Sequence, residues 1–171
     1  ADRGDLEQAE PMYRLMLNGM RAAHGDKHPS TMACVNNLAG VLSRLGRLSE
    51  AEPLCREAVR GLERLLGDYH PSTLASIDNL ASLLADQGKI EEAEEMYRKV
   101  LTRASAKLGP NHPVSGPVAY KLAGLLQSRG QQEDAASFYD AAALAFEDGY
   151  GPSFDGVIEA RRQAKEARGK S

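Results

Sequence analysis

Apolar residues recur along this chain with the spacing of an amphipathic helix. In two stretches they fall at positions i, i+3, i+4 and i+7: first Val35, Leu38, Ala39 and Leu42, then Ile77, Leu80, Ala81 and Leu84. This spacing places the apolar side chains on one face of an α-helix. The pattern therefore predicts helices over 31–45, 73–87 and 117–129, which we call helices A.

A second, more polar helix is predicted after each helix A. Gly46 is suited to the left-handed conformation that closes a helix, and Ser49-Glu50-Ala51-Glu52 has the spacing of a capping box. We therefore expect helices B over 49–66 and 91–108. The connector from Gly67 to Ser72 then supplies a glycine that ends one helix and a proline that suits the first turn of the next.

The same residue types return at a fixed interval of 42 positions. A constant step of this size marks an internal repeat. Four columns keep it without a gap: Gly4, Gly46, Gly88 and Gly130; Ala9, Ala51, Ala93 and Ala135; Gly25, Gly67, Gly109 and Gly151; and the pairs His28-Pro29, His70-Pro71 and His112-Pro113. Each repeat is thus a helical hairpin with a connector. One hairpin cannot bury its apolar face alone, so we expect the repeats to stack as an all-α solenoid.

Alanine recurs in both helices of each predicted hairpin. Ala39, Ala81 and Ala123 of helices A would face Ala51, Ala93 and Ala135 of helices B. Such small side chains let two helix axes approach to about 8–10 Å. A larger residue in either column would hold the hairpin open.

These columns resemble a known repeat family. The Gly-x4-Ala step, the aromatic column Tyr13, Tyr97 and Tyr139, and the Leu-Ala pair of helix A are similar to the tetratricopeptide pattern. The long period and the strings Asn-Asn-Leu-Ala at 36–39, Glu-Ala-Glu-Pro-Leu-Cys at 50–55 and Leu-Gly-Asp-Tyr-His-Pro at 66–71 resemble the kinesin light chain subtype. The resemblance implies a right-handed superhelix of antiparallel helix pairs that binds other proteins and is not an enzyme.

The predicted organisation is a single array over residues 1–171. Residues 1–27 are helix B of a truncated repeat, three full repeats occupy 28–69, 70–111 and 112–153, and 154–171 form a C-terminal capping helix and tail. Residues 1–3 correspond to the last turn of a helix A, so we expect the chain to begin inside a longer protein.

The third repeat departs from the pattern at Gly116-Pro117. Proline is tolerated only in the first turn of a helix. We therefore expect Ser115 to cap a helix that starts about one turn late. At the end of the chain, the charged residues between Asp155 and Arg168 predict the polar outer face that a terminal capping helix needs.

Charge separates the two kinds of helix. The three helices A hold five charged residues, whereas helices B over 49–66 and 91–108 alone hold fifteen. Helix B is therefore predicted to form the solvated, convex wall. Helix A would form the inner surface.

The inner surface is predicted to bind an extended peptide segment of a partner. Its polar face carries small residues and amides, which let a backbone approach and can both donate to it and accept from it. The candidate residues are Asn36, Asn37, Ser43, Arg44, Asp78, Asn79, Ser82, Tyr120, Lys121 and Gln127, with Gly40 and Gly124 between them. In kinesin light chains the second Asn of each Asn-Asn-Leu-Ala string contacts cargo peptide. The resemblance carries this role to Asn37 and Asn79, and in the third repeat Lys121 replaces Asn beside Tyr120.

A structural explanation competes with the groove. Asn36, Asn37 and Asn79 could instead tie neighbouring hairpins together. The repeated His28, His70 and His112 lie one hairpin apart, whereas zinc ligands converge within about 2.0–2.3 Å of one ion. We predict no metal, and expect these histidines to shape the connector before proline. Cys55 stands in the aromatic column and is expected to be a buried core thiol.

Composition excludes several classes of function. The net charge is −3 with both signs interspersed, which argues against a nucleic acid partner. No run reaches the roughly 18 apolar residues of a membrane span, so no membrane insertion is predicted. The sequence has no Gly-x4-Gly-Lys, Cys-x2-Cys or His-Glu-x2-His motif, and we predict no cofactor. Two cysteines on different helices favour a reducing, cytoplasmic location, with a cytoskeletal or ciliary association as an alternative.

Three functions stay open at this point. The first is an adaptor whose inner groove captures a partner peptide. The second is a structural scaffold subunit that docks through the convex helices B, for which Arg56, Arg60, Glu94 and Lys99 are the diagnostic residues. The third is a regulatory array fused to a signalling nucleotidase.

Overall fold

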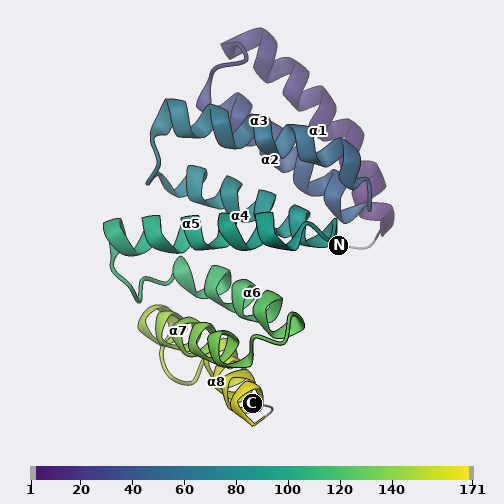
Figure 1. The fold of residues 1–171 in the computed structure, drawn as a ribbon. Coiled ribbons are helices and arrows are strands. Elements are labelled where there is room, and N and C mark those ends of the chain that lie inside the picture. The colour runs from purple at the N-terminus through teal and green to yellow at the C-terminus, as the bar shows by residue number, and fades with distance from the viewer. Residues whose placement is uncertain (1–2, 170–171) are drawn as a thin grey trace. The chain divides into compact units, whose positions relative to one another are not determined.

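The computed structural model describes residues 3–169, and every regular element within them is an α-helix (Figure 1). In chain order these helices are α1 (Arg3–His24), α2 (Pro29–Arg44), α3 (Leu48–Leu66), α4 (Pro71–Asp86), α5 (Ile90–Leu108), α6 (Ser115–Ser128), α7 (Gln132–Tyr150) and α8 (Asp155–Arg168). Helices A are α2, α4 and α6, and helices B are α3, α5 and α7. Their ends agree with the predicted ranges to within two residues.

The helices group into two compact units. Unit 1 runs from Ala1 to Lys89 and contains α1–α4, and unit 2 runs from Ile90 to Ser171 and contains α5–α8. The division falls inside the predicted repeat 70–111. The organisation as a single array therefore remains a prediction.

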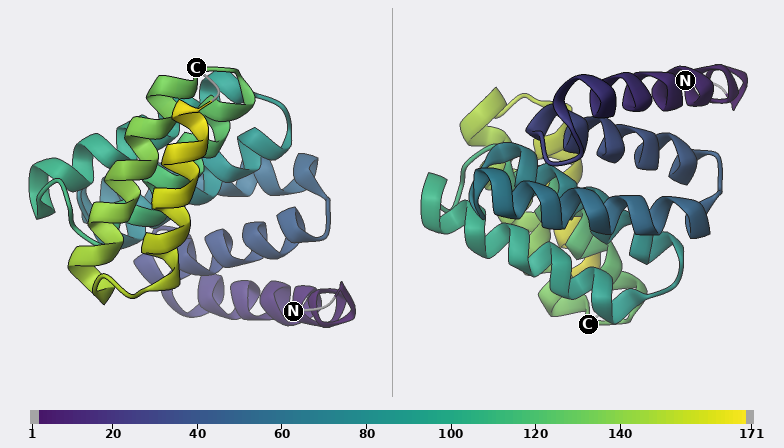
Figure 2. Two further views of the ribbon diagram at one scale, coloured as in Figure 1. Left: turned by 90° about the horizontal axis from the view of Figure 1, so that it is seen from below. Right: turned by 90° about the horizontal axis from the view of Figure 1, so that it is seen from above.

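Consecutive helices pack against each other inside each unit. In unit 1, α1 contacts α2, α2 contacts α3 and α3 contacts α4, and the two helices A, α2 and α4, also touch (Figure 2). In unit 2, α5 contacts α6, α6 contacts α7 and α7 contacts α8, and Figure 2 shows α7 and α8 side by side. This is the helix-pair packing that the repeat predicts.

The alanine columns lie in the core as predicted. Ala39 and Ala81 of helices A, and Ala51 of helix B, are completely buried in unit 1; Ala123, Ala93 and Ala135 are completely buried in unit 2. Cys55 is also buried, which confirms it as a core thiol, and burial raises the pKa of its thiol to about 11. Cys34 is buried as well.

Glycines close the helices A in the predicted way. Gly46 has φ +80°, its N–H donates to Ser43 O at 2.9 Å, and the N–H of Arg47 donates to Leu42 O at 2.9 Å. This pair of bonds is the Schellman motif, and it needs the left-handed conformation that glycine adopts without strain.

The repeated histidines cap the helices that follow them. His28 Nδ1 accepts a hydrogen bond from Ser30 N–H at 3.2 Å, and His70 Nδ1 accepts one from Ser72 N–H at 3.1 Å. Both residues are extended N-cap residues, with proline at the start of the helix. The predicted role before proline is confirmed, and the side-chain cap adds a detail that the sequence did not reveal.

The predicted capping box at Ser49 is wrong. The turn after Gly46 is so short that α3 already begins at Leu48, and its N-cap is Arg47, whose side chain makes no capping bond. Ser49 therefore lies inside the first turn. The carboxylate of Glu52 is instead held by Lys89 Nζ at 2.7 Å and Arg56 Nε at 2.9 Å.

The predicted cap at Ser115 is also wrong. Ser115 is the first residue of α6, the N-cap is Val114, and the buried Ser115 Oγ has no hydrogen-bond partner in the part of the chain that is described. The helix starts two residues late relative to α2 and α4, which is about half a turn. The turn before the helix differs: the N–H of Ser115 donates to His112 O, three residues back, at 2.8 Å. In α2 and α4 the corresponding carbonyls of His28 and His70 accept from Met32 and Leu74, four residues on.

The chain ends agree only partly with prediction. Arg3 is the first helical residue of α1 and does not belong to a helix A, while residues 1–2 lie outside the described residues. At the other end, α8 buries Val157, Ala160, Ala164 and Ala167 and exposes Arg161, Arg162, Lys165 and Arg168. This is the predicted polar outer face; residues 170–171 are not described.

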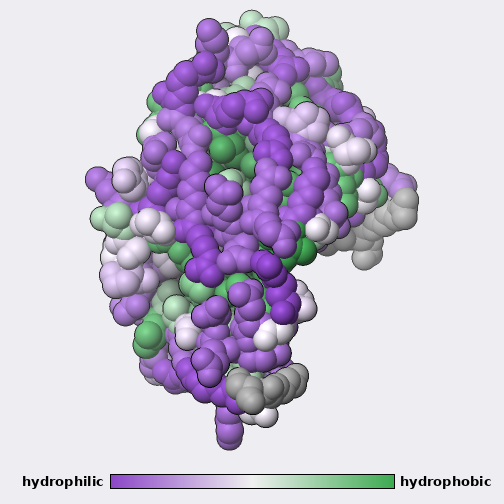
Figure 3. Space-filling model, in the orientation of Figure 1, coloured by the Kyte–Doolittle hydropathy of each residue, from purple (hydrophilic) through white to green (hydrophobic). Residues whose placement is uncertain are grey.

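Polar side chains predominate on the molecular face drawn in Figure 3, where apolar side chains form small, separate patches. Every helix within residues 3–169 is too short or too polar to cross a lipid bilayer.

Candidate functional site

A depression of about 220 Å³ lies between helices of unit 1, and we call its lining the amide face. It is lined by Tyr13 of α1, by Asn36, Asn37, Gly40, Val41 and Arg44 of α2, and by Asn79 of α4. Four of the ten predicted groove residues thus come together here: Asn36, Asn37, Arg44 and Asn79.

Helical periodicity places these side chains opposite the core. Val35, Leu38 and Leu42 of α2 are buried, so Asn36, Asn37 and Gly40, which lie between them on the other side of the helix, turn away from the hydrophobic interior. Gly40 lies in the middle of this outward face, and a Cβ atom added to it would meet nothing within 4 Å. The amide face is therefore open at the centre of α2.

The polar groups of the amide face are not used inside the described chain. Asn36 Oδ1 is buried and has no hydrogen-bond partner among residues 3–169. Asn37 and Asn79 are exposed, and neither side chain makes a hydrogen bond to another described residue. The exposed Arg44 likewise forms no ion pair within the described part. A buried acceptor without a partner is costly, so a ligand that donates to Asn36 would relieve that cost.

Three other predicted residues of unit 1 do not line the depression. Ser43, Asp78 and Ser82 are half-buried on α2 and α4. The Ser82 hydroxyl donates to the backbone oxygen of Asp78 at 3.0 Å, one turn earlier in the same helix. Such a local bond satisfies the hydroxyl within the helix.

In unit 2, two predicted groove residues belong to a cluster formed by the chain itself. The hydroxyl of Tyr139 on α7 donates to Gln127 Oε1 on α6 at 3.0 Å. The rings of Tyr120 and Tyr139 meet edge to face, with centroids 5.1 Å apart. Glu159 of α8 accepts a hydrogen bond from Tyr120. Lys121 is exposed on α6.

Burial sets the protonation of this tyrosine cluster. Desolvation raises the pKa of Tyr120 and of Tyr139 above the ordinary value, and the nearby Glu159 carboxylate raises both further. The pKa of Glu159 is lowered, mainly by its hydrogen bond from Arg162. Tyr120 therefore stays a neutral donor beside an ionised acceptor. The cluster occupies the polar face of α6 with groups from α7 and α8.

Sequence reasoning missed two residues of the amide face, Tyr13 and Val41. From the sequence, Tyr13 was identified only as a member of the aromatic column; Tyr97 and Tyr139 of this column are buried, whereas Tyr13 is half-buried. A signal was available: no helix of the described residues precedes α1, so its aromatic column has no hairpin partner there. Val41 carries no such signal, since it reads as a core residue.

The fold and the repeat together define an all-α protein built from antiparallel helix pairs. The sequence model of the tetratricopeptide repeat matches residues 31–106 and 73–146. These matches cover more than half of the chain, so the chain belongs to the tetratricopeptide repeat family. No curated protein matches the sequence at a significant level.

Solved structures share the same fold. The crystal structure of the nearly identical TPR-like repeats of a Podosopora anserina protein assigned to the kinesin light chains has TM-score 0.80 and 24% identity, covering 98% of this chain and 81% of that one. A variant crystal structure of those repeats gives TM-score 0.82 at 22% identity, covering 98% and 80%. BtubC (BKLC) from P. vanneervenii has TM-score 0.74 at 19% identity, covering 97% and 74%.

These comparisons confirm the predicted family and the tetratricopeptide-type, all-α solenoid class, with folds like those of kinesin light chain repeats. Proteins of this family are typically non-enzymatic scaffolds for protein–protein interaction. The chain is accordingly a repeat scaffold for protein–protein interaction.

Proposed function

We propose that this chain is an adaptor that binds an extended segment of a protein partner on the amide face of unit 1. The observation that carries the proposal is the convergence of Asn36, Asn37, Asn79 and Arg44 on one depression. None of these side chains makes a hydrogen bond or ion pair within the described residues.

The chemistry of the amide face suits an extended backbone. Each Asn amide offers a donor and an acceptor, so Asn37 and Asn79 can pair with main-chain groups whatever side chains the segment carries. Gly40 leaves room for close approach, and Arg44 adds a cation for a carboxylate of the ligand. In unit 2 the polar face of α6 is already occupied, because Tyr120 and Gln127 are engaged with α7 and α8, so the proposal rests on unit 1.

The proposal is tested with peptides selected from a random peptide library on the immobilised chain. Fluorescence polarisation then measures the selected peptides on the double variant Asn37→Ala with Asn79→Ala. We expect the affinity to fall at least about tenfold, because two hydrogen bonds of roughly 0.5–1.5 kcal/mol each are lost. Lys121→Ala, which alters unit 2, should leave the affinity unchanged.

The matched control is Asn18→Ala, which removes an exposed asparagine on α1 that does not line the amide face. Its affinity should equal that of the unchanged chain. Peptides that bind the double variant as tightly as the unchanged chain would rule out the amide face as the binding surface.

A scaffold that docks through helices B is less well supported at two of its diagnostic residues. Arg56 is held by Glu52, and Glu94 is held by Arg98 at 2.9 Å and Arg129 at 2.8 Å. These charges are satisfied within the chain. Arg60 is different and belongs to a second site.

A further inference from the structure

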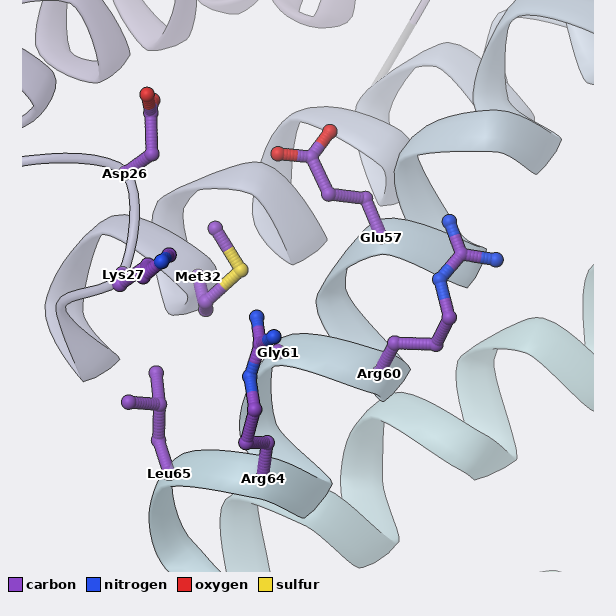
Figure 4. Close-up of a pocket in the computed structure, with 8 residues that line it drawn as sticks. All are labelled: Asp26, Lys27, Met32, Glu57, Arg60, Gly61, Arg64 and Leu65. Atoms are coloured by element: carbon purple, nitrogen blue, oxygen red, sulfur yellow. The ribbon is translucent and has the colours of Figure 1, made fainter.

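A second depression, of about 210 Å³, lies on another surface of unit 1. It is enclosed by the connector between α1 and α2, by the start of α2 and by the C-terminal half of α3 (Figure 4). Its lining, which we call the basic pocket, consists of Asp26, Lys27, Met32, Glu57, Arg60, Gly61, Arg64 and Leu65. It shares no residue with the amide face.

The floor of the basic pocket is apolar because α3 has a glycine at this point. The equivalent positions one and two repeats later hold Arg103 and Ala145, whereas α3 has Gly61. A Cβ atom on Gly61 would lie 2.3 Å from Met32 Sδ, so the missing side chain is what allows Met32 to lie against the helix. A glycine inside a helix costs roughly 1 kcal/mol relative to alanine. Leu65, 36% exposed, completes the floor.

The acidic groups of the pocket are already neutralised. Arg21 of α1 donates from Nη2 to Glu57 Oε1 at 3.4 Å. Its Nε lies 2.9 Å from Asp26 Oδ1, an ion-pair contact that lacks hydrogen-bond geometry. One guanidinium therefore serves both carboxylates on that side of the pocket.

The basic groups, in contrast, have no such partners. Lys27, Arg60 and Arg64 are all exposed, and none forms an ion pair with another residue in the described range. Arg60 and Arg64 are four residues apart, so they project from neighbouring turns of one helix face. Three available cations thus surround an apolar floor in a chain whose net charge is −3.

We propose that the basic pocket binds an acidic segment of a protein partner that carries one aliphatic side chain. The aliphatic side chain lies on Met32, Gly61 and Leu65, and flanking carboxylates pair with Arg60 and Arg64. Guanidinium groups bind carboxylates through paired hydrogen bonds, and these strengthen beside apolar surface. Lys27 closes the opposite side as a third cation.

The observations favour a peptide over a nucleic acid. Binding to a nucleic acid depends on many phosphate contacts along a broad basic surface. Here the cations are few and surround a recess, and the remaining charges of the chain are of mixed sign. A recess with an apolar floor fits a single side chain.

The test uses a fluorescein-labelled peptide, Gly-Gly-Glu-Glu-Leu-Glu-Glu-Gly-Gly, measured by fluorescence polarisation. We expect saturable binding that weakens as salt is raised. The Gln-Gln-Leu-Gln-Gln and Glu-Glu-Gly-Glu-Glu versions should each bind at least about tenfold more weakly, since one lacks the carboxylates and the other lacks the aliphatic side chain.

Charge reversal locates the site. Arg60→Glu with Arg64→Glu should abolish measurable binding, while the control Lys107→Glu with Lys165→Glu, which reverses two exposed lysines outside the pocket, should change affinity less than about twofold. Circular dichroism verifies that both variants remain helical. Backbone amide shifts in two-dimensional NMR should move at Lys27, Gly61 and Leu65.

Three results would overturn the proposal. Equal binding of the glutamine peptide would remove the role of charge, and shifts confined to Asn37 and Asn79 would assign the peptide to the amide face. Displacement of the peptide by an oligouridine at the same concentration would indicate a general polyanion site. Failure of the asparagine variants in the earlier experiment leaves this test unaffected, because the two sites share no residue.

Discussion

His28 and His70 each occupy the position before a proline, and each accepts a hydrogen bond from the backbone two residues later. Proline at the first helical position removes one of the unpaired N–H groups at the helix start, and the imidazole satisfies another. The dipeptide therefore provides both a fixed backbone angle and a side-chain acceptor. This gives a physical reason for the His-Pro pairs at 28 and 70; at 112 the imidazole accepts the same bond, from Val114 N–H, but the helix begins two residues later.

The capping role predicts a loss of stability in His70→Ala. The change removes the acceptor for Ser72 N–H at the start of α4 and should cost about 1 kcal/mol in the free energy of unfolding. Urea unfolding followed by circular dichroism measures this cost. The variant His70→Asp restores an acceptor at the N-cap and should recover most of the stability; if it is as unstable as His70→Ala, the cap is not the cause.

Residue type alone predicted some of these positions and not others. The helix end at Gly46 could be predicted because a positive φ there excludes most side chains. The outward direction of Asn37 and Asn79 could be predicted because helical periodicity fixes it. The hydrogen bonds of Tyr120 and Gln127 could not be predicted in this way, since their partners Glu159 and Tyr139 come from other helices. A single helix pattern does not contain that information.

At the scale of elements, α3 is tied to the end of α4 by a polar contact that the repeat pattern did not predict. Lys89, which follows α4, donates to Glu52 of α3, and Gln87 Nε2 donates to Leu48 O at 3.3 Å. The hydrogen bonds from Lys89 and Arg56 lower the pKa of Glu52 from the ordinary 4.5 to about 2. The ionised carboxylate therefore stabilises the folded state.

This shift predicts a pH-dependent difference between the unchanged chain and Glu52→Gln. The folded pKa lies below the unfolded one, so the contribution of Glu52 is complete above about pH 4.5 and is lost as the pH falls toward 2. Glu52→Gln should be less stable at pH 7, and the difference should shrink through that window. Urea midpoints between pH 2 and 7 measure it.

The control for this experiment is Glu95→Gln, at an exposed glutamate of α5 that has no ion pair within the described chain. Its urea midpoint should follow that of the unchanged chain at every pH. A Glu52→Gln difference that is the same at pH 3 and pH 7 would contradict the role of the Lys89 and Arg56 contacts.

Helix positions could be predicted closely because the apolar period and the glycines act locally, but helix starts were less certain. Ser49 and Ser115 were both predicted to be caps because serine is a common capping residue, but the preceding turn decides at which residue the helix begins. α6 starts only after a turn in which the N–H of Ser115 donates to His112 O. Gly116 allows Phe146 to approach so closely that a Cβ atom on this glycine would lie 2.7 Å from the phenyl ring.

At the scale of the whole molecule, the sequence and the contacts suggest different boundaries. The step of 42 residues continues through Gly46, Gly88 and Gly130 without interruption. The compact units, however, divide at Lys89 and Ile90, between helix A and helix B of one repeat. A linear array whose repeats support their neighbours would unfold together, whereas independent units would not.

We expect the continuous 42-residue repeat, and not the division into two units, to determine how cooperatively the chain unfolds, so that both units unfold in one transition. The chain has no tryptophan, which allows one fluorescent probe to be placed in each unit at the same column of the repeat. Leu54 of α3 and Phe138 of α7 are two repeats apart and both half-buried, so Leu54→Trp and Phe138→Trp place matched probes. Their urea midpoints should coincide with each other and with circular dichroism. Two separated midpoints, each reported by one probe, would mean that the division at Lys89 governs folding and that the single array is wrong.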